Sequence, residues 1–232
     1  MKKKFILFLG LIFSISAHGL SSYEASYDLY ADMALGSLKI GQANFKLKAD
    51  NDQYTYTNEA SVSPLWETLY NYSRSETSSG LVVNQQLISN YYKLLERKGD
   101  SVHKEIEIDI FVDQNFSMVG ETKHWKNGPG KIADELSIYL ALSRDISIQP
   151  SKKIFTYQVA DSEGIKPQNF SVLGKEAVEI NGEQLQTVLI SCPELRLTLN
   201  YSEKFDYLPV LIRKTNGGNR FYLTLTEYTK LD

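Results

Sequence analysis

The feature that most constrains this fold is a strict two-residue alternation of apolar and acidic side chains between Lys104 and Val112. The apolar positions in this stretch are Ile106, Ile108, Ile110 and Val112. Because successive side chains of a β-strand point to opposite faces, all four would lie on one side of an extended chain. The segment therefore predicts a strand in an antiparallel sheet with one dry face and one wet face.

Similar alternation recurs along most of the chain. It is clear over Tyr23–Tyr30 and again over Phe221–Thr226, and the dipeptide Asn181-Gly182 is a strong hairpin signal. Counting such segments predicts about a dozen antiparallel strands, and twisted open sheets of more than about ten strands tend to curl or split. We therefore expect a mostly β protein built on one large curved sheet, a half-barrel or clamshell.

Residues 131–145 depart from this pattern and predict the main helix. Apolar side chains recur there at spacings of three and four, which gathers them into one stripe. The stripe contains Ile132, Leu136, Tyr139, Leu140 and Leu142. Asp134 is expected in the first turn, where a carboxylate can accept backbone N–H groups. We expect this helix to pack on the concave face of the sheet, and a short turn or helix at Pro64–Tyr70.

The N-terminus has the pattern of a cleavable signal peptide. Three lysines precede an apolar run, Phe5 to Phe13, which small residues follow. The run is shorter than the roughly 20 residues that a membrane-spanning helix needs. Cleavage after Ala17 or after Gly19 fits, and Gly19 is preferred. The sequence thus predicts a signal peptide over residues 1–19 and one all-β domain over residues 20–232, exported to the periplasm, with no transmembrane segment after cleavage.

Composition limits the partners and the source of stability. The formal charge is −3, and a signal peptide with three lysines and no acid would leave the mature chain at −6, which argues against nucleic acid as a partner. Cys192 is the only cysteine, so no intramolecular disulfide can form. Because 42% of the residues are hydrophobic, a large core is expected to stabilise the domain.

Catalytic and metal-binding motifs are not found. The chain has no GxSxG, no HExxH and no CxxC. His103 and His124 with a nearby glutamate are better explained as strand residues than as metal ligands, and paired carboxylates of a glycoside hydrolase stay open as a minor alternative. We predict a non-enzymatic protein without a metal or cofactor.

Aromatic side chains are the more informative group, because 12% of the residues are Phe, Trp or Tyr. On a curling sheet they could line a cavity and leave polar tips at its rim, or simply fill the core. The cavity hypothesis predicts contact with an apolar ligand by lid and lining residues. These are Tyr27, Ile40, Trp66, Trp125, Leu136, Tyr139 and Leu140.

Three short motifs resemble a known family. They are Tyr23-Glu24-Ala25-Ser26-Tyr27 with the following Gly41-Gln42-Ala43, then Asp134-Glu135-Leu136-Ser137-Ile138-Tyr139, and last Leu208-Pro209-Val210 with Leu223-Thr224-Leu225. In this order they resemble the bacterial periplasmic family catalogued as domain of unknown function 3108. The resemblance implies an envelope location in a Gram-negative bacterium and a single β-rich domain, and it carries over no catalytic residue.

Three functions are compatible with these observations. The first is a non-enzymatic envelope protein that binds a lipid or another apolar ligand in the half-barrel. The second is a structural or protein-interaction module of the envelope with a dry core. The third is a hydrolase acting on carbohydrate, which the absence of a recognisable catalytic motif disfavours.

Overall fold

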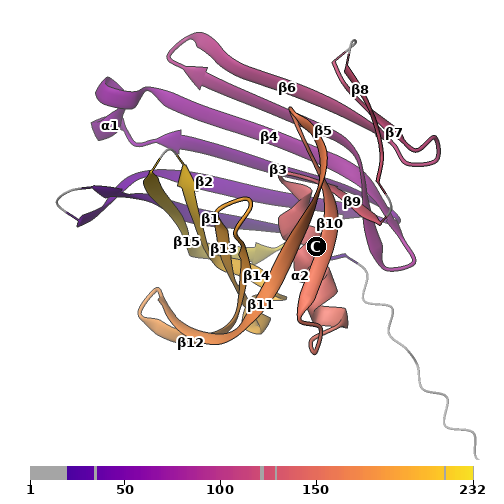
Figure 1. The fold of residues 1–232 in the computed structure, drawn as a ribbon. Helices are drawn as coiled ribbons and strands as arrows, with labels where there is room; N and C mark the ends of the chain where they lie inside the picture. The colour runs from indigo at the N-terminus through magenta and orange to yellow at the C-terminus, as the bar shows by residue number, and fades with distance from the viewer. Residues whose placement is uncertain (1–19, 34–35, 121–122, 129, 217, 232) are drawn as a thin grey trace, which may run out of the picture.

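A computed structural model describes residues 20–33, 36–120, 123–128, 130–216 and 218–231 of the chain (Figure 1). The predicted signal peptide, residues 1–19, lies outside the described residues. The first half contains β1 (Tyr23–Met33), β2 (Gly36–Asp50), β3 (Gln53–Val62), α1 (Pro64–Tyr70), β4 (Tyr72–Val83), β5 (Gln86–Lys98), β6 (Ser101–Phe111), β7 (Phe116–Val119) and β8 (Lys123–Lys126). The second half contains β9 (Lys131–Asp134), α2 (Ser137–Ile148), β10 (Ile154–Asp161), β11 (Gly164–Ile180), β12 (Glu183–Cys192), β13 (Leu197–Ser202), the 3₁₀ turn η1 (Glu203–Phe205), β14 (Leu208–Asn216) and β15 (Asn219–Lys230).

The strands form one continuous sheet. Its order is β8-β7-β6-β5-β4-β3-β2-β1-β15-β14-β13-β12-β11-β10-β9, so each half of the chain is a meander and β1 pairs with β15 where the halves meet. Neighbours are antiparallel except β9 and β10, which are parallel. The prediction of a mostly β protein with one large curved antiparallel sheet is confirmed, and the described residues contain fifteen strands where about a dozen were expected.

Local predictions made from periodicity agree with the structure. Ile106, Ile108 and Ile110 are buried on β6, whereas Val112 lies in the following turn and is exposed. The short helix α1 begins with Pro64 in its first turn. Asn181 and Gly182 form the two-residue turn between β11 and β12, and both have positive φ, as this hairpin type requires.

The main helix is shorter at its start than predicted. Residues 131–134, assigned to the helix from sequence, form β9 and pair in parallel with β10, with Lys131 opposite Tyr157. α2 begins at Ser137, because the carboxylate of Asp134 accepts the N–H groups of Leu136 and Ser137, each at 2.8 Å, and so ends the strand and starts the helix. The cap is therefore present, but it precedes the helix and does not lie within its first turn.

α2 covers the concave side of the sheet, as predicted. It packs against β5, β9, β10 and β14, which belong to both halves of the meander (Figure 1). Its buried residues come from more than one face, because the helix has sheet on several sides. They are Ser137, Ile138, Leu140, Ala141, Leu142, Asp145 and Ile146. Tyr201 on β13 donates a hydrogen bond to the carbonyl of Tyr139 at 3.2 Å, which fixes the helix to the second half.

The two edges of the sheet differ. Edge strand β9 is covered: Ile132, Ala133 and Asp134 are all buried beneath β5. Edge strand β8 has exposed side chains except at Trp125, which is half-buried. Within the described residues, no helix has the length and apolar character needed to cross a membrane.

Candidate functional site

The predicted lining residues of the helix region come together inside the half-barrel. The exposed fraction is 1% for Tyr27, 1% for Leu136 and 4% for Leu140. The ring of Tyr27 lies 5.1 Å from that of Phe45, which in turn lies 6.4 Å from that of Tyr139. The hydroxyl of Tyr27 donates to the carbonyl of Pro209 at 2.8 Å, so its polar end is already satisfied within the protein.

These side chains and their neighbours form a packed core beneath α2. The largest fully buried side chains of the inner face have exposed fractions below 2%, whereas Tyr139 and Arg74 are partly exposed. Among the fully buried side chains are Tyr56, Tyr92, Tyr157, Tyr201, Phe155 and Phe170. Binding of an apolar ligand among these residues would therefore require α2 to move away from the sheet.

The other three predicted lining residues lie elsewhere. Ile40 is buried at the end of the sheet next to α1, where its carbonyl accepts the N–H of Ser63 at 2.8 Å. Trp66 on α1 is half-buried, and its indole N–H donates to the carbonyl of Lys39 at 3.0 Å. Trp125 lies on β8. The seven residues thus occupy three separate places, and their contact with a ligand stays a prediction.

A charged network lies on the inner face of β4. Arg74 binds Glu76 through two hydrogen bonds of 2.8 Å, from Nε and Nη2, in a fork, and it also contacts Glu96 on β5. Glu76 is buried and receives two further hydrogen bonds, from Asn58 at 2.9 Å and Tyr92 at 2.8 Å. Burial alone would raise the pKa of Glu76, but Arg74 and these donors hold it below its ordinary value.

Two polar side chains near the start of α2 face this network: Glu135 precedes the helix and Tyr139 belongs to it. Burial raises the pKa of Glu135 above its ordinary value, although the charges of Lys214 and Arg74 oppose the shift. Burial also raises the pKa of the Tyr139 hydroxyl, and the charge of Glu76 adds to the effect. Glu135 and Tyr139 therefore lie close to the buried ion pair, in surroundings that disfavour an additional negative charge.

A second polar cluster is centred on Asp134. Its carboxylate is fully buried. It accepts hydrogen bonds from the hydroxyl of Ser78 on β4, at 2.6 Å, and from the hydroxyl of Ser89 on β5. Ser137 donates to the same carboxylate through its hydroxyl at 2.8 Å. Burial raises the pKa of Asp134, and these donors limit the rise. The cluster links β9 and the start of α2 to the opposite half of the sheet. We call it a structural pin, because all its hydrogen bonds join parts of the fold to one another.

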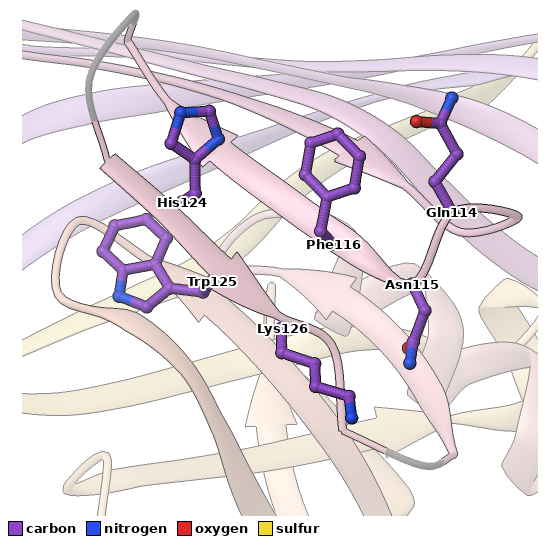
Figure 2. Close-up of a pocket in the computed structure, with 6 residues that line it drawn as sticks. All are labelled: Gln114, Asn115, Phe116, His124, Trp125 and Lys126. Carbon is purple, nitrogen blue, oxygen red and sulfur yellow. The ribbon is translucent and has the colours of Figure 1, made fainter.

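The larger of two described surface hollows lies at the β7–β8 hairpin and not on the concave face. It has a volume of about 510 Å³ and is lined by Gln114, Asn115, Phe116, His124, Trp125 and Lys126. Figure 2 shows Phe116 and His124 pointing to the same side of the hairpin, while Trp125 leaves β8 in another direction. The rings of Phe116 and His124 are 6.2 Å apart, and Phe111 stacks on Phe116 at 4.8 Å.

A second hollow of about 300 Å³ lies over the outer face of β2, β3, β4 and β5. Its lining is mostly polar: Asn44, Glu59, Ala60, Ser61, Ser73, Arg74, Ser75, Leu95 and Arg97. Neither hollow brings together three metal-ligating side chains, and no such group occurs elsewhere in the part of the chain that the structure describes.

Sequence reasoning did not find the charged network or the hairpin hollow. A signal for the first was present, because Arg74 and Glu76 are two residues apart and would share a face of any strand that contained them. Their partners Asn58 and Tyr92 are each 16 or more residues away, so burial of the pair could not be read locally. The hollow depends on where the sheet ends, which the alternation pattern does not indicate.

Comparison with known proteins supports the fold and no finer assignment. No family model matches the chain, and no curated protein matches it. Among solved structures, the chain is similar to a crystal structure of a beta-barrel-like protein of domain of unknown function DUF1849 from Brucella abortus. The two share 12% sequence identity and a TM-score of 0.61, over 92% of this chain and 99% of that one. The chain therefore has a beta-barrel-like fold found in an uncharacterised domain.

Proposed function

We propose that this chain is a non-enzymatic, exported protein of the bacterial envelope that acts as a protein-interaction module. The observation that supports this most directly is the packed core: the largest inner-face side chains are buried, and the described hollows lie outside that core. A packed core leaves the outer surface and the edges of the sheet for function. Membership of the family of domain of unknown function 3108 and a periplasmic location belong to the same proposal.

A second candidate is binding of a lipid or other apolar ligand by the half-barrel. It is favoured by Glu135 and Tyr139, which place polar groups at the start of α2, next to the Arg74–Glu76 ion pair. A ligand with a polar head and an apolar tail could contact these groups while its tail displaced part of α2. This candidate requires a conformational change, whereas the interaction module does not.

Native mass spectrometry of the mature protein, purified from the periplasm and extracted for lipids, separates the two candidates. The interaction module predicts the bare mass of the chain and no uptake of palmitate or of phosphatidylethanolamine on titration. A co-purifying lipid that is lost in Leu136→Asp, while the far-ultraviolet circular dichroism is unchanged, would overturn the proposal in favour of the carrier. Leu65→Asp is the matched control, because Leu65 is 81% exposed on α1 and outside the interior.

The proposed location has its own test. Osmotic shock of cells that express the full chain should release a processed protein that begins near residue 20. Retention of the intact chain in the spheroplast fraction would contradict export.

A further inference from the structure

We infer that edge strand β8 is a docking site for an extended polypeptide segment of another protein, which adds a strand to the sheet and carries carboxylates on its outer side. The inference rests on the proposed function and assigns the site and the chemistry of the partner. It follows from the backbone register, the side chains around the strand and the charge of the strand.

The register determines which backbone groups are free. In an antiparallel pair, hydrogen-bonded and non-bonded residue pairs alternate. The N–H of Asn127 donates to the carbonyl of Asn115 at 2.9 Å, and Trp125 pairs with Ser117 two residues along. Trp125 therefore bonds to β7, and the N–H and C=O groups of His124 and Lys126 point away from it.

A second hydrogen bond supports the same register. On the other side of β7, the N–H of Gly120 donates to the carbonyl of Glu107 on β6 at 3.0 Å. By alternation Met118 also bonds to β6, so Ser117 and Val119 bond to β8. Because β8 is the last strand in the order, two consecutive bonding positions stay open for an added strand.

This edge contrasts with the other one. Ile132, Ala133 and Asp134 of β9 are buried beneath β5, whereas β8 is contacted by the start of β11 at Trp125 and its other side chains are exposed. Exposed edges present a row of unpaired backbone groups that can template pairing with another chain. The hollow of about 510 Å³ is lined by both strands of the hairpin, and three of its lining residues, His124, Trp125 and Lys126, belong to β8.

The side chains indicate the composition of the added strand. Its outer face would lie beside His124, which points to the same side as Phe116 (Figure 2), and beside Lys126, which the strand register assigns to the same face. Its inner face would meet Trp125, whose indole packs against Gly164 at the β10–β11 turn. β8 carries no carboxylate; by alternation Lys126 lies on the outer face and Lys123 on the face of Trp125. Charge complementarity with Lys126 therefore favours an acidic residue outside, and the Trp125 ring favours an apolar residue inside.

Amide hydrogen exchange, measured by NMR on the ¹⁵N-labelled mature chain, tests the free edge directly. The amides of His124 and Lys126 should exchange much faster than that of Trp125, because only the last is bonded to β7. A blocked nonapeptide of alternating glutamate and valine is the probe, and it should protect the two fast amides. The same peptide with lysine in place of glutamate should bind at least about tenfold more weakly at low salt.

A matched pair of variants separates backbone from side-chain recognition. His124→Ala keeps the outward N–H and should bind the acidic peptide within about threefold of the wild type. His124→Pro removes that N–H without breaking a bond to β7, since proline is tolerated at edge positions of this kind. It should weaken binding by at least about tenfold.

Three results would overturn the inference. They are slow exchange at His124 and Lys126 in the free protein, equal affinity of the alanine and proline variants, and peptide protection confined to another surface such as the outer hollow on β2–β5. The exchange measurement needs only the wild-type chain, so it tests the inference even if the proline variant does not fold. A co-purifying lipid would overturn the proposed function but would leave the exchange rates of the His124 and Lys126 amides unchanged. Slow exchange of these two amides in a lipid-free protein would overturn only the docking site.

Discussion

Replacement of Asp134 by alanine should destabilise the fold by about 3 kcal/mol. The substitution leaves the N–H groups of Leu136 and Ser137 without their acceptor, and a buried unsatisfied donor costs about 1–3 kcal/mol. The hydroxyls of Ser78 and Ser89 also lose their acceptor, but they can rotate toward other groups and contribute less. Removal of the desolvated carboxylate itself offsets part of the loss.

The assay is urea denaturation followed by circular dichroism at pH 7, together with a thermal melt. For a domain of this length, about 3 kcal/mol corresponds to a decrease in Tm of roughly 6–12 °C. Asp134→Asn is the matched control, because one amide oxygen can still accept both N–H groups, and it should cost about 1 kcal/mol. If Asp134→Ala unfolds within about 0.5 kcal/mol of the wild type, the carboxylate is not a structural pin and the reasoning fails.

Other substitutions test the remaining contacts. Glu76→Gln should cost about 3 kcal/mol at pH 7, since it breaks a buried ion pair. The folded-state pKa of Glu76 is lowered, so its contribution to the free energy of unfolding is fully present above the unfolded pKa of about 4.3 and is lost as the pH falls through the folded pKa. The difference in the free energy of unfolding between wild type and variant, measured in urea melts, should therefore become smaller in acid. Tyr27→Phe removes the bond to Pro209 and should lower the free energy of unfolding by about 1 kcal/mol, with an unchanged m-value in urea. Gly80→Ala would place Cβ 1.9 Å from the carbonyl oxygen of Ile88, so it should abolish soluble expression, and normal yield with a wild-type melt would contradict the β4–β5 register.

Much of the fold could be predicted because its information is local. The alternation in β6 and the Asn181-Gly182 turn depend on residues a few positions apart, and both agree with the structure. Fold class followed from counting such segments, since a sheet this wide must curve. The number of strands was underestimated because β9 and the β7–β8 hairpin contribute only four residues per strand.

The start of the main helix could not be predicted from local spacing. Ile132 and Leu136 are four residues apart, which fits a helix, yet both are buried for different reasons: one lies in β9 and the other at the beginning of α2. The strand exists because β10, more than twenty residues later, pairs with it in parallel. Long-range pairing of this kind overrides the local pattern.

The candidate sites depend still more on distant residues. An aromatic composition indicated either a cavity or a core, and only the positions of all the strands decide between them. In the structure the aromatic residues of the inner face fill the core, while Phe116 and His124, which alternate toward the outer face of a short hairpin, stay accessible. The same residue types therefore have opposite roles according to which face of the sheet they occupy.

The covered edge at β9 and the open edge at β8 follow from one property of the sheet. A meander of this length that curves without closing has two edges, and unpaired backbone groups at an edge must be covered, blunted or used. At β9 the chain turns inward, and Asp134 holds it against Ser78 and Ser89, so that edge and the concave face are covered together. β8 ends before this inward turn and has no strand beyond it. Because the Asp134 cluster covers the β9 edge, we place binding at the β8 edge, where outward backbone groups, Trp125 and the positive charge of Lys126 lie together.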